Sequence, residues 1–224
     1  MIIYFDIETL PINDPKLIAD LAETIKPPAT IKKPESINKW MTENKEQKLK
    51  KLVAETSLDG LYGQVACIAW AIDDGEIASS EWSLNEADAI NEFYSAILDF
   101  NPNHTSFCGH DLHRFDLPFL KHRSIINRLQ PPQVLINAMN AKAWDERILD
   151  TKLMWSPDRQ IYVSMNTLCN ALGIEGKGDF DGSMVAETWP VNPGKVIDYC
   201  RDDVARTREI YKRLTFQEQK AVNE

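Results

Sequence analysis

The chain has 224 residues, of which 43% are hydrophobic and 26% are charged, and its formal net charge is −9. A chain of this length and composition forms a globular protein with a sizeable core. The acidic balance argues against a passive coat on nucleic acid, because such proteins are normally basic. It remains compatible with an enzyme that gathers carboxylates around cations.

The four cysteines show no metal-binding pattern, because none forms a Cys-x-x-Cys pair and no histidine lies at zinc-finger spacing. They indicate a reducing, cytoplasmic setting. The N-terminus lacks the basic region of a signal peptide. No apolar stretch approaches the roughly 20 residues needed to span a bilayer, so we expect no membrane contact.

The chain begins with a short apolar run, Ile2 to Phe5, which predicts a buried strand. A long polar insertion follows at about 11–63, with a lysine-rich helical stretch within it. Between Lys26 and Lys51, eight lysines stand against three glutamates, a local balance of +5. Two interpretations are open for this stretch: a solvated helical face, or a flap beside the site that holds substrate phosphates.

The remaining patterns predict strands and helices that alternate irregularly along the chain. The expected strands are 65–72, 77–82 and 105–108, and the expected helices are 85–100, 119–129, 165–172 and 193–214. The sequence Asp73-Asp74-Gly75 predicts a hairpin turn between the first two of these strands. We therefore expect one α/β domain over 1–224, with a mixed central β-sheet flanked by helices. The order of the elements fits a ribonuclease H-like layout.

Asp6 and Glu8 lie two residues apart at the end of the first strand, so both side chains point to the same face. Taken alone, this pair could simply be solvated. The strand that carries it, however, has the pattern of one buried on both sides, and buried carboxylates need partners.

Further carboxylates follow in two other blocks. Asp116 stands where the fourth strand runs into a helix, and it could merely cap that helix. Tyr199 and Asp203 share one face of the last helix, which could reflect an ordinary structural hydrogen bond. Asp150 is a weaker candidate, either supporting the site or capping a helix.

These carboxylates together predict one site. Four converging carboxylates would repel one another, and one or more would be driven to take up a proton. Divalent cations remove that conflict. A ligand set of oxygens alone favours Mg²⁺ or Mn²⁺ over zinc.

Three blocks of the sequence resemble the motifs of a known family. The blocks Phe5-Asp6-Ile7-Glu8-Thr9, Gly109-His110-Asp111-Leu112-His113-Arg114-Phe115-Asp116 and Tyr199-x-x-x-Asp203 resemble the three exonuclease motifs of the DEDD superfamily, and the tyrosine resembles its DEDDy branch. The stretch from Gly176 to Ser183 and the block Tyr199-Cys200-Arg201-Asp202-Asp203-Val204 are similar to predicted 3′–5′ exonucleases related to the proofreading domain of family-B DNA polymerases. The resemblance runs from Met1 to about Leu214.

The resemblance implies a ribonuclease H-like fold and a single-stranded nucleic acid with a free 3′ end as substrate, with DNA favoured over RNA. It implies two divalent cations, Mg²⁺ or Mn²⁺, and release of nucleoside 5′-monophosphates. Asp6, Glu8 and Asp203 would bind the first cation, and Asp6 would bridge to the second with help from Asp116. Tyr199 would orient the attacking water.

Four further residues are predicted to contact substrate: Thr9, Leu10, Asp111 and Phe115. Asp111 departs from the family pattern, which usually has Asn there, and a carboxylate cannot donate the hydrogen bond that an amide would donate near the 3′ end. The alternative function is a catalytically weak nucleic-acid-binding or adaptor subunit of a replication or repair complex, with a separate polymerase or helicase as partner. The presence of all four acids favours the enzyme.

Overall fold

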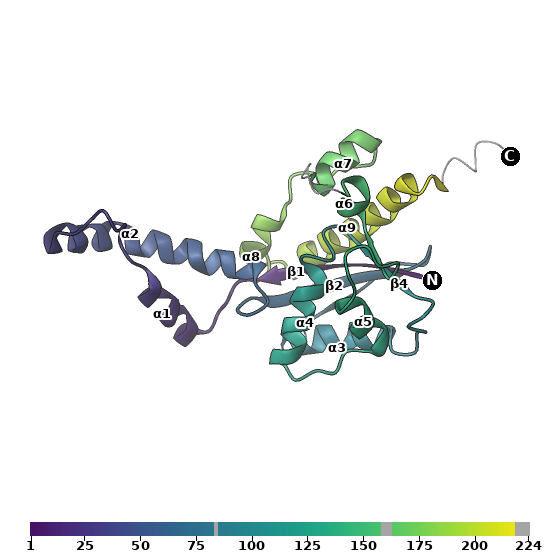
Figure 1. The fold of residues 1–224 in the computed structure, drawn as a ribbon, viewed down its shortest axis with the longest axis horizontal. Coiled ribbons are helices and arrows are strands. Elements are labelled where there is room, and N and C mark those ends of the chain that lie inside the picture. Colours follow the sequence, from purple (N-terminus) through teal and green to yellow (C-terminus); the bar gives the residue numbers. More distant parts are fainter. Residues whose placement is uncertain (83–84, 158–162, 218–224) are drawn as a thin grey trace.

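A mixed sheet lies at the centre of the structure, a computed structural model that describes residues 1–82, 85–157 and 163–217 (Figure 1). Its strands are β1 (Ile2–Leu10), β2 (Gln64–Ile72), β3 (Ala78–Glu81), β4 (Ser106–Gly109) and β5 (Ile148–Asp150). They lie in the order β3-β2-β1-β4-β5. β2 is antiparallel to both β1 and β3, whereas β4 is parallel to both β1 and β5. The predicted mixed sheet and its early hairpin are therefore confirmed.

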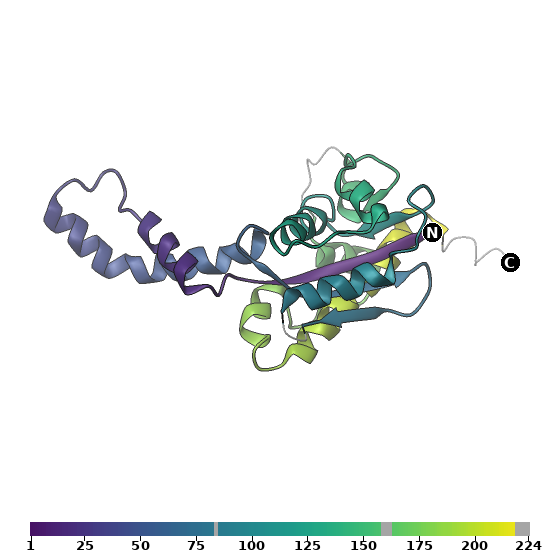
Figure 2. The same ribbon diagram turned by 90° about the horizontal axis from the view of Figure 1, so that it is seen from below.

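The helices lie on the two faces of this sheet and in an arm that extends beyond it. They are α1 (Pro15–Thr24), α2 (Pro34–Glu55), α3 (Glu86–Ala96), α4 (Asp116–Ile126), α5 (Gln133–Met139), α6 (Thr151–Trp155), α7 (Met165–Leu172), α8 (Val185–Thr188) and α9 (Pro193–Leu214), with 3-10 turns η1 (Thr56–Leu58) and η2 (Gly182–Met184). In Figures 1 and 2, α3, α4 and α5 lie on one face and α9 crosses the other. Within the described ranges, no helix combines the length and the apolarity that a bilayer crossing requires.

The alternation of β1 assigns its side chains to these two faces. Ile3, Phe5 and Ile7 enter the core formed with α3, α4 and α5, and Phe5 stacks on Phe93 at 5.3 Å between ring centroids. Tyr4 enters the second core, formed with α8 and α9. Because successive side chains of a strand point to opposite sides, the even-numbered residues of β1 face α9.

α9 has the bounds that its apolar periodicity predicts. The side chain of Asn192 caps its N-terminus by accepting a hydrogen bond from the backbone N–H of Lys195, and Pro193 occupies the first turn. Val196, Cys200 and Val204 are fully buried against the sheet. This stripe fixes the rotation of the helix and therefore the direction in which its polar residues point.

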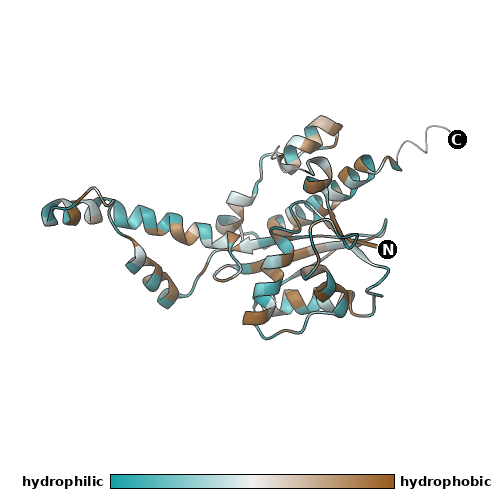
Figure 3. Cartoon of the chain, in the orientation of Figure 1, coloured by the Kyte–Doolittle hydropathy of each residue, from teal (hydrophilic) through white to brown (hydrophobic). Residues whose placement is uncertain are grey.

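The insertion at 11–63 forms a helical arm, built from α1 and α2, that projects away from the sheet (Figure 1). Neither helix contains a buried residue, and α2 is hydrophilic along most of its length (Figure 3). Lysine–glutamate pairs four residues apart, such as Lys39–Glu43 and Lys50–Glu46, support a helix of this kind. The lysine-rich stretch lies in α2, which forms an outward arm, and only the base of this arm lies beside the sheet.

Candidate active site

Three carboxylates from two elements meet on the α9 face of the sheet. Asp6 and Glu8 project from β1, and Asp203 projects from α9. One carboxylate oxygen from each lies within 4.8 Å of the others. The hydroxyl of Tyr199, one helical turn before Asp203, faces the same cluster. The strand alternation and the buried stripe of α9 are thus sufficient to bring these side chains together.

Asp116 approaches this cluster from the first turn of α4. The pairing of β1 with β4 extends only as far as Tyr4 opposite Cys108. Beyond that point the backbone N–H of Ile7 donates to Asp116 Oδ1 at 3.3 Å. Asp116 is 2% exposed, and its charge interacts with that of Asp6. It therefore lies beside the group formed by the other three acids, at the fork where β1 and β4 separate.

Burial and mutual repulsion raise the pKa of these acids. Burial and then the charge of Asp203 raise the pKa of Asp6 from 3.8 to about 7. The pKa of Glu8 is well above its ordinary value because of burial and the neighbouring Asp6. The pKa of Asp116 is raised for the same two reasons. A cluster with these properties takes up either protons or cations.

Two cationic side chains partly neutralise the cluster at Asp203. The ammonium group of Lys177 pairs with Asp203 Oδ2 and donates to the hydroxyl of Tyr199 at 2.7 Å. The guanidinium of Arg206 donates to Asp203 Oδ1 at 2.9 Å. Burial acts to lower the pKa of Lys177, but Asp203 and Tyr199 outweigh it and raise that pKa, so Lys177 stays charged.

The loop that carries Lys177 is held in place from both sides. Arg206 donates to the carbonyls of Glu175 and Gly176 at 3.2 and 3.1 Å, and Asn166 accepts from the backbone N–H of Lys177 at 3.1 Å. A Cβ at Gly176 would lie 2.7 Å from Asn166 Oδ1, so a larger residue there would displace the side chain that accepts from Lys177. Sequence reasoning singled out the stretch that contains Lys177 but gave this lysine no chemical role. Arg206 was also missed, although its position three residues after Asp203 on the same helix predicts that the two side chains can pair.

A cleft of about 330 Å³ opens over the cluster. It is lined by Asp6, His110, Asp111, Lys152, Ser164, Met165, Asn166, Lys177, Asp181, Gly182, Tyr199 and Asp203. Asp111 has a left-handed backbone, with φ of 69°, and its carboxylate accepts from the ammonium of Lys152 at 2.7 Å. The acid that stands where the family usually has Asn thus has a cationic partner inside the cleft. Asp150 caps α6 and also accepts from the backbone N–H groups of Asp111 and His113, which fixes this side of the cleft.

The other residues predicted to contact substrate have structural partners. The hydroxyl of Thr9 donates to the carbonyl of Ser57 at 2.7 Å, and Leu10 is buried in the core beneath α9. Phe115 packs against Phe119 with ring centroids 5.6 Å apart. Their contacts with substrate stay predictions.

Similarity to known proteins agrees with this fold. The family B DNA polymerase from the hyperthermophilic archaeon Pyrobaculum calidifontis shares the fold with a TM-score of 0.59, at 15% sequence identity, over 96% of this chain and 24% of the polymerase chain. The chain thus spans about a quarter of the length of that polymerase, and its fold is ribonuclease H-like. No curated protein matches the sequence.

A family model also matches residues 47–223. The chain belongs to the family of predicted 3′–5′ exonucleases related to the exonuclease domain of PolB. The matched segment begins inside α2, so most of the helical arm lies outside it.

Proposed function

We propose that the chain hydrolyses single-stranded nucleic acid, DNA in preference to RNA, from its 3′ end and releases nucleoside 5′-monophosphates. In this proposal Asp6, Glu8, Asp116 and Asp203 hold two divalent cations. The observation that carries it is the convergence of three carboxylates within 4.8 Å, of which Glu8 and Asp203 are buried and Asp6 is partly exposed, beside the hydroxyl of Tyr199. Family membership supports the reaction class.

The donor set of the cluster fits Mg²⁺ or Mn²⁺. Its ligand atoms are carboxylate oxygens, which suit hard cations. The thiol of Cys200 lies nearby and donates to Asp6 Oδ2 at 3.6 Å. Burial holds the pKa of that thiol well above its ordinary value. When bound, the cations lower the pKa of water and neutralise charge on the phosphate and on the leaving 3′ oxygen.

Tyr199 orients the attacking water and does not act as its base. Burial and then Asp203 raise the pKa of its hydroxyl, so the group stays neutral. A neutral phenol both donates and accepts hydrogen bonds. Its lone pair accepts from Lys177 at 2.7 Å, which leaves the O–H proton available for a water above the cluster.

Lys177 supplies positive charge at the floor of the cleft. Its ammonium group stays charged and contacts both Tyr199 and Asp203. With cations held by the acids, the ammonium of Lys177 would be free to contact the phosphate that undergoes attack. Fixed charge of this kind stabilises the transition state more than the substrate, because negative charge concentrates on the phosphoryl oxygens during the reaction.

Product analysis tests the proposal. Single-stranded DNA labelled at its 5′ end is incubated with the protein and Mg²⁺ or Mn²⁺, with an EDTA control. We expect stepwise shortening from the 3′ end, nucleoside 5′-monophosphates as products, and no reaction with EDTA. Asp203→Asn should abolish shortening while the protein stays folded. Binding without shortening under any divalent cation would instead support the adaptor function.

A further inference from the structure

The helical arm carries positive charge on an otherwise acidic protein. Its segment from Lys26 to Lys51 has a net charge of +5, whereas the whole chain has −9, so the rest of the chain carries −14. A cleft lined by several acids repels the phosphates of a nucleic acid strand beyond the one that the cations bind. A strand longer than a few nucleotides therefore needs a cationic surface elsewhere on the molecule.

Five lysines of the arm are free to provide such a surface. Three others are paired within α2, as Lys39–Glu43, Lys50–Glu46 and Lys51–Glu55. In the described part of the chain, no acidic partner lies within 4 Å of the remaining five, which are Lys26, Lys32, Lys33, Lys45 and Lys48. The ammonium of Lys48 also lies over the ring of Trp40, at 5.2 Å from its centroid. Lysines interleaved with an aromatic ring are typical of surfaces that bind single strands.

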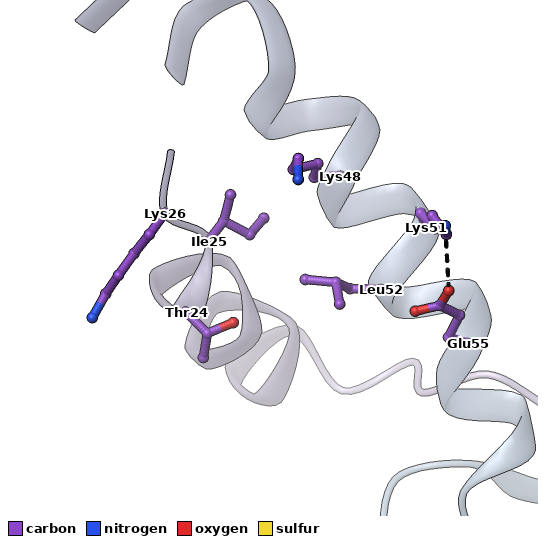
Figure 4. Close-up of a pocket in the computed structure, with 7 residues that line it drawn as sticks. All are labelled: Thr24, Ile25, Lys26, Lys48, Lys51, Leu52 and Glu55. Atoms are coloured by element: carbon purple, nitrogen blue, oxygen red, sulfur yellow. Dashed lines mark ion pairs between the residues drawn. The ribbon is translucent and has the colours of Figure 1, made fainter. Parts of the chain in front are cut away.

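Two of these lysines, Lys26 and Lys48, line a pocket between the two helices of the arm. The pocket has a volume of about 380 Å³ and is lined by Thr24, Ile25, Lys26, Lys48, Lys51, Leu52 and Glu55. In Figure 4, the side chains of Ile25 and Leu52 point into the space between the helices, Lys48 lies one turn before Leu52 on α2, and the side chain of Lys26 points away from this space. An apolar floor edged by ammonium groups suits a nucleotide, which presents a base face and a phosphate.

The base of the arm is fixed beside the carboxylate cluster. The hydroxyl of Thr56 accepts from the backbone N–H of Ile12 at 2.9 Å, and Ser57 accepts from Thr9, the residue after Glu8. Arg123, which pairs with the buried Glu86, donates to the carbonyl of Gly60 at 3.1 Å. The pocket residues of α2 lie within two turns of this base. α2 has 22 residues and so extends about 33 Å from it.

We propose that the helical arm binds the phosphodiester backbone of the strand whose 3′ end lies in the cleft, with Lys26, Lys45 and Lys48 as the main contacts. The proposal rests on the proposed function for the identity of the strand. It concerns a part of the chain that lies mostly outside the segment matched by the family. Charge complementarity and the fixed base beside the cluster favour nucleic acid over a second copy of the chain as the partner.

Binding without cleavage tests the arm separately from the reaction. The anisotropy of a fluorescent single-stranded DNA is measured in EDTA over a range of salt concentrations. The variant K26Q/K45Q/K48Q removes three charges from the arm. The matched control, K121Q/K142Q/K212Q, removes three charges from the body of the protein. Circular dichroism checks that both variants keep their helices.

We expect the arm variant to bind about 10- to 100-fold more weakly at 0.1 M salt, because each lost phosphate contact removes released counterions. The slope of log affinity against log salt should become shallower by about 2, at roughly 0.7 for each single-strand contact. The control should stay close to the parent protein, as should cleavage of a dinucleotide by the arm variant if the proposed function holds. If neither the parent nor the variants cleave, but the arm variant still shows the shallower salt slope, the proposed function is refuted and the proposal for the arm is not.

An arm variant with the parent slope would overturn the proposal. Analytical ultracentrifugation tests the rival partner, a second copy of the chain. If the arm docks on the acidic body of a second copy, the parent protein should sediment as a dimer. A dimer that the arm substitutions dissolve, together with an unchanged salt slope, would assign the arm to self-association instead.

Discussion

Replacing Asp6 with Asn should make the cation-free protein more stable. Burial and then the charge of Asp203 raise the pKa of Asp6 to about 7. The folded protein keeps a proton on Asp6 up to about pH 7, whereas the unfolded chain releases it near pH 3.8. The free energy of unfolding therefore falls as the pH rises through this window. An amide carries no charge, so Asp6→Asn removes the free-energy cost of holding a charged carboxylate in the cluster at high pH.

The size of the effect follows from the pKa. A rise from 3.8 to about 7 corresponds to about 4 kcal/mol at pH 8. Asp6 keeps partial exposure to the cleft, and solvent screening reduces the expected gain to about 2–4 kcal/mol. For a protein of this length that gain raises the melting temperature by about 5–15 °C. At pH 5 the folded parent already holds the proton, so the advantage of the variant should fall to less than half.

Thermal unfolding in EDTA at pH 8 and at pH 5 measures the difference. The matched control is Asp198→Asn, which makes the same charge change at an exposed position of α9. Adding Mn²⁺ should raise the melting temperature of the parent and of the control more than that of Asp6→Asn. An Asp6→Asn protein no more stable than the control at pH 8 would refute the view that the cluster is electrostatically strained.

Three further outcomes are expected. Tyr199→Phe should slow single-turnover cleavage about 10- to 100-fold, because one oriented hydrogen bond is lost, and it should keep the Mn²⁺-induced rise in melting temperature. An unchanged rate would show that the hydroxyl does not orient the water. Lys177→Gln should lower turnover and also lower the melting temperature in EDTA, opposite in sign to Asp6→Asn, because the cluster loses a counter-charge; a stability equal to the parent would contradict this. Glu86→Gln should lower the free energy of unfolding by about 3 kcal/mol in urea titration, because it leaves the buried guanidinium of Arg123 without its anion. A loss below about 1 kcal/mol would show that this ion pair does not stabilise the fold.

The sequence predicted those parts of the fold that have a long, regular pattern. The bounds of α9 match because Pro193 marks its start and a buried stripe from Val196 to Tyr211 gives it a long regular period. β1 is longer than its apolar run suggests, because Asp6 and Glu8 continue the strand into the site. The short elements α5, β5, α6 and α8 were missed, since segments of three to seven residues show too little periodicity to recognise.

Local spacing predicts which side chains share a face within β1 and within α9, but it does not predict their counter-charges. The period of the strand predicts that Asp6 and Glu8 share a face, and helical spacing predicts that Tyr199 accompanies Asp203. Lys177 reaches Asp203 from a loop 26 residues earlier in the chain, and Lys152 reaches Asp111 across 41 residues. Contacts of this kind depend on the path of the loops, which no local pattern records.

The shape of the arm was also beyond the sequence. A helix rich in lysine and glutamate has no apolar face to show where it docks, and α2 has no buried residue. Its direction is set by hydrogen bonds at its base, such as those of Thr56 and Thr9, between residues more than 40 positions apart.

Anomalous scattering from crystals grown with Mn²⁺ most directly tests whether the carboxylate cluster is a divalent cation site. We predict a strong anomalous peak in contact with Asp6, Glu8 and Asp203, and a second peak between Asp6 and Asp116. Crystals of Asp6→Asn should show neither peak at full height. Parent crystals with no anomalous peak at the cluster, under Mn²⁺ concentrations that support turnover, would contradict the proposed role of these four acids.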